Sequence, residues 1–171
     1  MAENIENSTE LVPCKLEEQP ILANLFQLYA HDFSGFYDVD LGPEGRYIYT
    51  PLPLYWSEPT RFPFLVKVNG ELAGFALVKR GSDVSGDPEI WDMAEFFVIR
   101  KHRRHGVGTR IAHQVWRRFP GRWEVRVLQL NDSAKPFWER AIAQFTGTTI
   151  QPVPFEKESD AWNVFSFESP A

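Results

Sequence analysis

The apolar positions of this chain change their spacing several times, and each change predicts a different element of secondary structure. They recur at helical intervals over residues 17–31, which predicts an amphipathic helix. Two apolar runs, over residues 62–68 and 72–78, then flank Asn69-Gly70. Because Asn-Gly readily adopts the positive φ angles of a tight turn, this pattern predicts a β-hairpin.

The second half of the chain alternates between strand and helix patterns. A nearly continuous apolar run over residues 90–99 is interrupted by Asp92 and Glu95 and predicts a buried strand. Helical spacing follows from Val107 to Phe119, where Pro120-Gly121 ends it. The remaining patterns predict a strand over 123–130, a helix over 133–145, and strands near 148–156 and 161–168.

The predicted order is a helix, a β-hairpin, a strand, a helix, a strand, a helix and two further strands. This order is typical of an α+β protein with a mixed α/β sheet that has one β-α-β unit at its centre. The chain has 171 residues, of which 43% are hydrophobic, and this is enough for the core of one domain. We expect that domain to span residues 11–171 and the polar residues 1–10 to form a flexible N-terminus.

Residues 32–61 form a long predicted connection whose composition differs from the rest. The connection is rich in proline and glycine. Its aromatic residues are Phe33, Phe36, Tyr37, Tyr47, Tyr49, Tyr55 and Trp56. Long connections with their own aromatic residues are often binding loops or lids. The alternative is that most of these rings only cover the sheet.

Composition and charge argue against several classes of protein. The formal net charge is -5, which favours neither nucleic acid nor an anionic membrane as a partner. No apolar run approaches the ~20 residues that a membrane-spanning helix needs, and the acidic N-terminus differs from a signal peptide. Cys14 is the single cysteine, so we expect no internal disulfide and a reducing, cytoplasmic location. No Cys and His cluster has zinc-ligand spacing, so no metal is expected.

A basic turn over residues 100–110 separates the predicted strand from the helix that begins near Val107. Backbone N–H groups at the start of a helix lack partners within the helix, and the helix dipole favours an anion there. Gly106 and Gly108 let the backbone approach a ligand closely. The turn is therefore a candidate phosphate cradle. The alternatives are a solvent-exposed basic loop and a nucleic-acid patch, and the acidic total charge opposes the latter.

The stretch from Arg103 to Gly108, RRHGVG, resembles the R/Q-x-x-G-x-G/A signature of the GNAT superfamily of acyl-CoA-dependent N-acyltransferases. A second motif follows where the next predicted strand ends. Its residues Asn131, Ala134, Phe137 and Trp138 are similar to the N-x-x-A-x-x-F-Y pattern of the superfamily. The two motifs in this order are specific together, and the resemblance implies a GNAT-like fold for this single domain.

The resemblance also implies an acetyl-CoA site in which the backbone supplies most contacts. The pyrophosphate would lie on the backbone N–H groups from Arg103 to Thr109, and the pantetheine arm would pair with the strand backbone near Phe97 to Ile99 like an added strand. Asn131 would contact the pantetheine or separate two strands, whereas the helical spacing of Ala134 and Phe137 fits core positions better than ligand positions. The implied cofactor-binding residues are Phe97, Val98, Ile99, Arg103, Arg104, His105, Gly106, Val107, Gly108, Thr109, Asn131, Phe137 and Trp138.

Acetyl transfer to an amine requires a base, because an amine with a pKa near 10 is mostly protonated at neutral pH. Glu95 is the candidate base, since a carboxylate in an otherwise apolar strand needs a reason. Equally, Glu95 could be a strand-edge carboxylate that pairs with an arginine. Asp92 is the second candidate, on the opposite face of a regular strand, although a bulge would change that. A backbone N–H near Val98 is the candidate oxyanion donor.

Trp138 departs from the family pattern, in which a tyrosine at this position often protonates the leaving thiolate. An indole has no hydroxyl group and is a very poor acid. Either the thiolate leaves unassisted, or another group serves, and Tyr47, Tyr49 and Tyr55 are the candidates.

The connection over residues 32–61 also carries the acidic residues Asp32, Asp38, Asp40 and Glu44. Carboxylates beside aromatic faces suit a cationic amine. We therefore expect an acetyl-CoA-dependent N-acetyltransferase that acts directly on a small-molecule or peptide amine, with a small cationic amine favoured. Cys14 lies far from both motifs, which argues against a covalent thiol intermediate. The alternative is a non-catalytic acyl-CoA-binding sensor or regulatory domain, and the sequence leaves open whether the protein is a homodimer.

Overall fold

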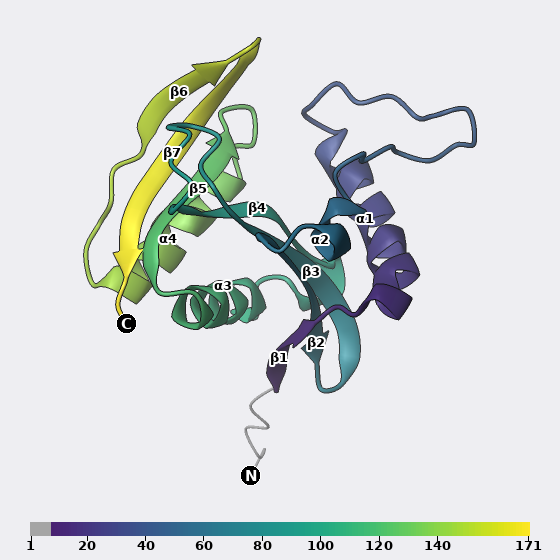
Figure 1. The fold of residues 1–171 in the computed structure, drawn as a ribbon, viewed down its shortest axis with the longest axis horizontal. Coiled ribbons are helices and arrows are strands. Elements are labelled where there is room, and N and C mark those ends of the chain that lie inside the picture. Colours follow the sequence, from purple (N-terminus) through teal and green to yellow (C-terminus); the bar gives the residue numbers. More distant parts are fainter. Residues whose placement is uncertain (1–7) are drawn as a thin grey trace.

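The computed structural model describes residues 8–171, which form one seven-stranded sheet with helices on both faces (Figure 1). The strand order is β1-β2-β3-β4-β5-β7-β6. The strands are β1 Thr9–Pro13, β2 Arg61–Val68, β3 Glu71–Arg80, β4 Trp91–Val98, β5 Gly121–Leu128, β6 Val153–Lys157 and β7 Asp160–Ser169. The helices are α1 Gln19–Phe33, α2 Leu54–Ser57, α3 Val107–Arg118 and α4 Ala134–Thr146, with 3-10 turns at Leu16–Glu18 and Arg100–His102. The pair β4–β5 is parallel and the other neighbours are antiparallel, so the predicted mixed sheet is confirmed.

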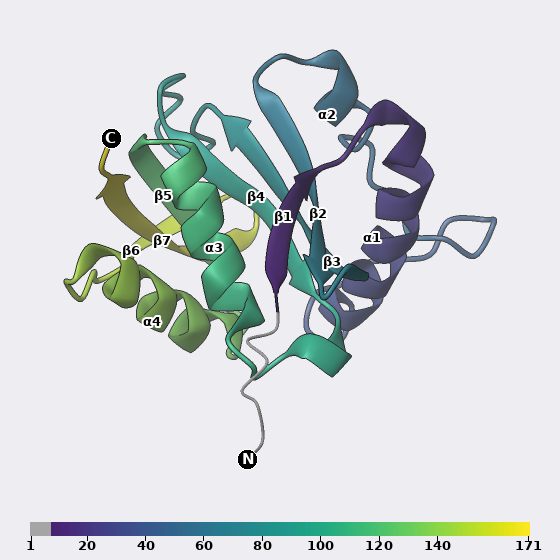
Figure 2. The same cartoon turned by 90° about the horizontal axis from the view of Figure 1, so that it is seen from below.

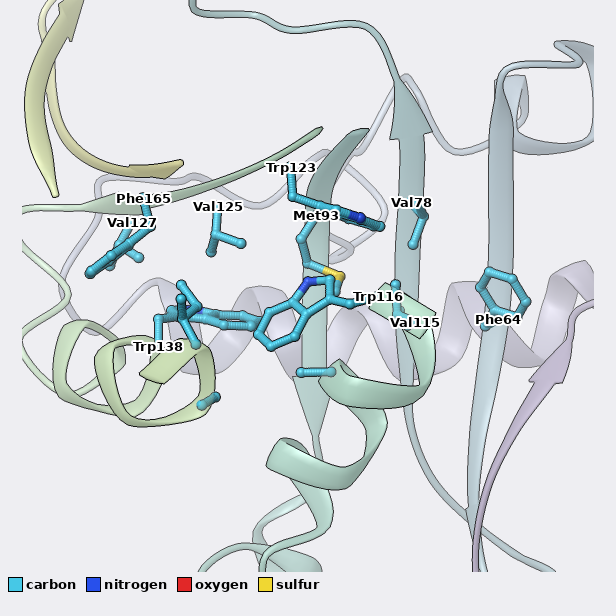
Figure 3. Packing of buried hydrophobic residues seen from close by; sticks show 14 residues of the cluster. Phe64, Val78, Met93, Val115, Trp116, Trp123, Val125, Val127, Trp138 and Phe165 are labelled. Atoms are coloured by element: carbon cyan, nitrogen blue, oxygen red, sulfur yellow. The ribbon is translucent and has the colours of Figure 1, made fainter. Parts of the chain in front are cut away.

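The helices divide between the two faces of the sheet (Figure 2). Helices α1 and α2 cover one face, where Phe26 packs in a cluster with Phe75 of β3. Helices α3 and α4 cover the other face, where Trp116 and Trp138 pack with Met93 of β4 (Figure 3). At roughly 25 cal/mol per Å² of apolar surface removed from water, these two clusters are the main source of stability.

The predicted β-hairpin is confirmed between β2 and β3. Asn69 and Gly70 take φ angles of 51° and 80°, as a two-residue turn of this kind requires. Further along β3, Gly74 lies directly against β4, because a Cβ atom there would be 1.9 Å from the carbonyl oxygen of Phe97. This close approach holds the end of β4 against β3.

Strands β4 and β5 pair only at one end. Their parallel ladder joins Trp91 to Trp123 and Asp92 to Glu124, and it stops there. Beyond this point β4 remains paired with β3 and β5 remains paired with β7. The two strands therefore diverge, and a gap opens in the middle of the sheet between two unpaired strand edges.

A β-bulge interrupts β4 beside this gap. Leu77 of β3 lies opposite Glu95, whereas the next residue of β3 lies opposite Met93, so Ala94 is the extra residue. Successive strand residues point to opposite faces, and the insertion shifts this alternation by one. Asp92 and Glu95 consequently share the α1 face of the sheet, which a regular strand would not allow.

The N-terminal segment corrects one expectation. The sequence predicts a flexible N-terminus over residues 1–10, but Thr9 and Glu10 begin strand β1, and residues 1–7 lie outside the described range. Strand β1 pairs with β2, and Gln114 of α3 also holds it: its Oε1 accepts a hydrogen bond from the N–H of Leu11 at 3.2 Å, and its Nε2 donates to the carbonyl of Thr9 at 2.9 Å. A strand of five residues is too short to leave a clear apolar pattern.

Most other predicted elements lie within a few residues of their observed bounds. The connection over 32–61 is mainly loop, although it contains α2, and β6 begins at Val153 rather than near residue 148. Pro20 lies in the first turn of α1, where a missing N–H costs no helical hydrogen bond, and the helix begins at Gln19. Across residues 8–171, no helix combines the length and apolar character that a bilayer crossing requires.

Candidate active site

A cavity of about 460 Å³ occupies the gap between β4 and β5. Its wall includes Met93, Val125 and Trp138, which belong to the core on the α3–α4 side of the sheet. Tyr29 of α1 and Glu95 line it on the opposite side. The divergence of the two strands thus connects the two faces of the molecule in one cavity.

Glu95 lies on the wall of this cavity and is bound by tyrosine hydroxyls. The hydroxyl of Tyr29 donates a hydrogen bond to its Oε2 at 2.6 Å, and the hydroxyl of Tyr49 is a second donor. Burial raises the pKa of Glu95 to about 7, while the two tyrosines and the more distant Arg126 limit the rise. A carboxyl group with a pKa near neutrality can both accept and release a proton at physiological pH.

Asp92 occupies a different environment, although the bulge places it on the same face. It is buried and does not line the cavity. Nη2 of Arg126 lies 2.8 Å from its Oδ2, and Nζ of Lys79 lies 3.7 Å from the same oxygen. Of the two carboxylates predicted as bases, Asp92 is therefore the one paired with an arginine, and Glu95 is the one that a substrate can reach.

The basic turn forms a run of free backbone donors. Among the described residues, the N–H groups from Arg104 to Thr109 donate to no protein acceptor, whereas the N–H of Arg103 donates to the carbonyl of Arg100 at 3.2 Å. The phosphate cradle predicted over residues 103–109 therefore has free backbone N–H groups at 104–109, and Arg103 does not contribute one. Gly106 precedes α3 with φ of 73°, in the left-handed region that glycine adopts without strain.

The second glycine of the turn has a packing role. A Cβ atom on Gly108 would lie 3.0 Å from Cε2 of Phe137 on α4. The missing side chain therefore lets the first turn of α3 approach α4 closely. Phe137 fills that position, so the residues that fit the acyl-CoA site implied by the motifs are the free N–H groups at the start of α3 and not Gly108 itself.

The arginine side chains of the turn bind the protein itself. Arg100 and Arg103 each place an Nη2 atom 2.6 Å from a carboxylate oxygen of Asp32 at the end of α1. Nε of Arg103 also donates to the carbonyl of Val98 at 2.7 Å. These two arginines hold the pKa of Asp32 below its usual value, although its partial burial opposes them. Asp32, predicted to attract an amine, instead forms ion pairs with two arginines of the basic turn and so fixes the turn to the end of α1.

The backbone of Val98 faces the gap. The N–H of Ile99 donates to the carbonyl of Ala73 on β3 at 2.8 Å. Because backbone groups alternate in direction along a strand, the N–H of Val98 points away from β3, where β5 has already diverged. Of the three residues predicted to meet the pantetheine arm, Phe97, Val98 and Ile99, the middle one therefore has an N–H directed to the side where β5 has diverged.

The second motif lines the cavity from the α4 side. The side-chain Oδ1 of Asn131 accepts the N–H of Ala134 at 3.3 Å, so Asn131 orders the start of α4. Phe137 and Trp138 both line the cavity and pack against Phe96 of β4, with ring centroids 6.0 and 5.0 Å apart respectively. They contribute to the core and to the site together.

The structure separates the three tyrosines considered as proton donors. Tyr47 and Tyr49 line the cavity, whereas Tyr55 is buried in the core behind it. Sequence reasoning missed Tyr29, because it fitted the apolar face of a predicted helix, and Trp162, because it lies in the tail. It also missed Arg126, and its charge between two valines of β5 was the available signal.

The sequence model of the acetyltransferase (GNAT) family matches residues 22–142. Because this match covers most of the chain, the chain belongs to the GNAT family of acetyltransferases. A comparison with curated proteins found no match.

Solved structures of several acetyltransferases are similar. An acetyltransferase from Thermus thermophilus is 18% identical, with a TM-score of 0.69 over 94% of this chain and 97% of that chain. The aminoglycoside acetyltransferase AAC(6')-Ib in complex with coenzyme A is 12% identical, with a TM-score of 0.69 over 94% and 95%. The protein yncA from Salmonella typhimurium with its cofactor acetyl-CoA is 12% identical, with a TM-score of 0.62 over 95% and 94%. At these identities the similarity concerns the fold.

Proposed function

We propose that this protein is an acetyl-CoA-dependent N-acetyltransferase that transfers the acetyl group directly to an amine. One juxtaposition carries the proposal: a cavity has a carboxyl group with a near-neutral pKa on its wall, and the run of free backbone donors lies, at Gly108, against the Phe137 ring that lines the same cavity. The family supports the same activity. Two similar structures contain coenzyme A or acetyl-CoA, which supports an acyl-CoA donor here.

The donor would bind along the edge of β4 and the start of α3. The free N–H groups from Arg104 to Thr109 would hold the pyrophosphate at the helix N-terminus. The N–H of Val98 would bind the pantetheine arm or the thioester oxygen, because it faces the gap. The pairs of Arg100 and Arg103 with Asp32 keep the turn in place, so these side chains contribute to the site without contacting phosphate.

Glu95 would act as the base. In its ionised form it accepts a proton from the ammonium group of the substrate, and the free amine attacks the thioester carbonyl carbon. A C–N bond forms, and the negative charge moves to the carbonyl oxygen, near a backbone N–H. Collapse of this intermediate breaks the C–S bond and releases the coenzyme A thiolate. The second amine proton leaves to solvent, or to Glu95 once Glu95 has released the first proton to solvent.

The thiolate would leave without a dedicated tyrosine at the position of Trp138. A thiol has a pKa near 8.5, so its anion is a moderately good leaving group and can take its proton from solvent afterwards. Cys14 is not part of this chemistry. It is buried outside the cavity, and burial together with Glu18 raises the pKa of its thiol to about 12, which suppresses the nucleophilic thiolate.

The acceptor would be a small cationic amine. Asp40 and Glu95 supply negative charge on the cavity wall, and aromatic rings lie beside them. An ammonium group is attracted both to carboxylates and to the faces of such rings. Asp38 and Glu44, predicted to join them, do not line the cavity.

The test combines binding and turnover. Calorimetry with acetyl-CoA measures the donor site, and release of the coenzyme A thiol in the presence of an amine measures transfer. Binding with transfer supports the enzyme, whereas no binding contradicts it. Trp138 favours one second candidate, a non-catalytic acyl-CoA sensor, which predicts tight binding without transfer to any amine.

A further inference from the structure

We propose that the acceptor is a monoamine whose amino group is attached to an aromatic body, such as an arylalkylamine. This inference rests on the proposed acetyltransferase function and concerns the other half of the same cavity. It is carried by the rings and charges that line the α1 side, together with the way in which the loop over residues 34–53 crosses that side.

Aromatic rings form most of the acceptor side. They come from three separate parts of the chain, namely α1, the loop that follows it and β7: Phe33, Tyr37, Tyr47, Tyr49 and Trp162. Each ring is half-buried, so each still presents part of its surface to the cavity. Tyr49 stacks on Phe26 with centroids 4.5 Å apart, which fixes its orientation. Rings held in this way favour a flat aromatic guest through stacking and edge contacts.

The charges on the wall are few. Among the described residues that line the cavity, the carboxylates are Glu95 and Asp40. Arg126 also lines the cavity, and its Nη2 lies 2.8 Å from Asp92 and 3.0 Å from Asp83. The charges of these two carboxylates therefore compensate Arg126 and are not available to bind a substrate amine. With Glu95 assigned to the reacting amine, one further carboxylate remains. A polyamine or an aminoglycoside carries three or more ammonium groups, so it would leave at least one of them without a carboxylate partner.

The loop limits the size of the acceptor. The hydroxyl of Tyr37 donates to Oδ2 of Asp160 at 2.8 Å, and so links the loop to the start of β7 across the cavity. The cavity of about 460 Å³ must also hold the acetyl thioester. These two facts favour a body of one or two rings over a polypeptide or an oligosaccharide.

The experiment compares acceptors with the full-length protein. Thiol release and the mass of the product are measured with 2-phenylethylamine, tryptamine, ethylamine, spermidine, kanamycin and an alanine tripeptide. We expect kcat/KM for the two aryl amines to exceed that of every other acceptor by at least roughly tenfold, the ratio that about 1.4 kcal/mol of ring contact would provide.

Two variants distinguish ring contact from a general effect on folding. Trp162→Leu removes a ring of the acceptor wall, and Trp91→Leu removes a ring at the closed end of the β4–β5 pair, away from the cavity. We expect Trp162→Leu to raise KM for tryptamine at least fivefold while the Kd for acetyl-CoA stays the same. Trp91→Leu should leave both constants unchanged at a temperature where melting curves show that both variants are folded.

The outcomes separate this inference from the function on which it rests. If acetyl-CoA binds and spermidine, kanamycin or the peptide is the preferred acceptor, the inference is wrong and the acetyltransferase function stands. The same holds if aryl amines react no better than ethylamine, or if Trp162→Leu leaves the KM for tryptamine unchanged. Acetyl-CoA binding without any transfer overturns the inference in favour of a sensor. Absence of acetyl-CoA binding overturns the proposed function itself.

Discussion

The hydroxyl of Tyr29 donates a 2.6 Å hydrogen bond to Oε2 of Glu95, and it thereby joins helix α1 to the bulged strand β4 at the cavity wall. The bond stabilises the ionised form of a carboxylate whose burial favours the neutral form. These opposing effects place the pKa of Glu95 at about 7. Several properties of the protein should depend on this balance.

Replacement of Glu95 by Gln should remove the base without changing the shape of the site. We expect kcat to fall by roughly 10²- to 10⁴-fold, the usual contribution of a positioned base, with the Kd for acetyl-CoA unchanged. Glu124→Gln is the matched control, because Glu124 is buried on β5, accepts a hydrogen bond from Ser82, and does not line the cavity. Full turnover by Glu95→Gln would exclude Glu95 as the base.

The pH dependence of the reaction should report the Tyr29–Glu95 bond. Since the base acts when it is ionised, kcat/KM should rise with pH through about 7. Tyr29→Phe removes a donor that lowers the pKa of Glu95, so the rise should move to higher pH. A pH–rate profile of both proteins measures this shift. An unshifted profile in the variant would mean that the rise belongs to another group.

The stability of the protein should depend on pH for the same reason. The pKa of Glu95 is about 7 in the folded protein against 4.5 as its ordinary value, so between these pH values the folded state binds more protons. Stability is therefore lost as the pH rises through this window and stays low above it. Glu95→Gln should raise the melting temperature more at pH 8 than at pH 5. An equal change at both pH values would contradict this account.

The turn before α3 can be tested with two glycines of the same conformation. Gly106 and Gly147 both have φ of 73°, so replacement of either by Val costs similar backbone strain. We expect Gly106→Val to weaken acetyl-CoA binding by at least about tenfold, because it deforms the run of free N–H groups. Gly147→Val, at the end of α4, should leave that affinity unchanged. Calorimetry on the folded variants measures the affinity of each for acetyl-CoA. If Gly106→Val and Gly147→Val bind acetyl-CoA equally well, the pyrophosphate binds elsewhere.

Much of the fold and the donor site could be predicted from the sequence, because local patterns specify them. Asn69-Gly70 needs no distant partner to form its turn, and apolar spacing marks α3 and α4 as amphipathic. The turn between β4 and α3 likewise follows from its glycines and its place between a strand and a helix. The short strand β1 was missed because it is stabilised by β2 and by Gln114, and neither contact leaves a local signal.

By itself, the sequence determined the mixed sheet, the candidate phosphate cradle and two carboxylates in one strand. Only the tertiary structure distinguished those carboxylates, because a bulge at Ala94 turns both toward α1, where Asp92 meets Arg126 and Glu95 meets Tyr29. It also assigned Asp32 to the arginines of the basic turn. The physical reason is that backbone turns and amphipathic faces depend on neighbours in sequence. The charge and pKa of a buried side chain depend on groups that the fold brings from distant parts of the chain.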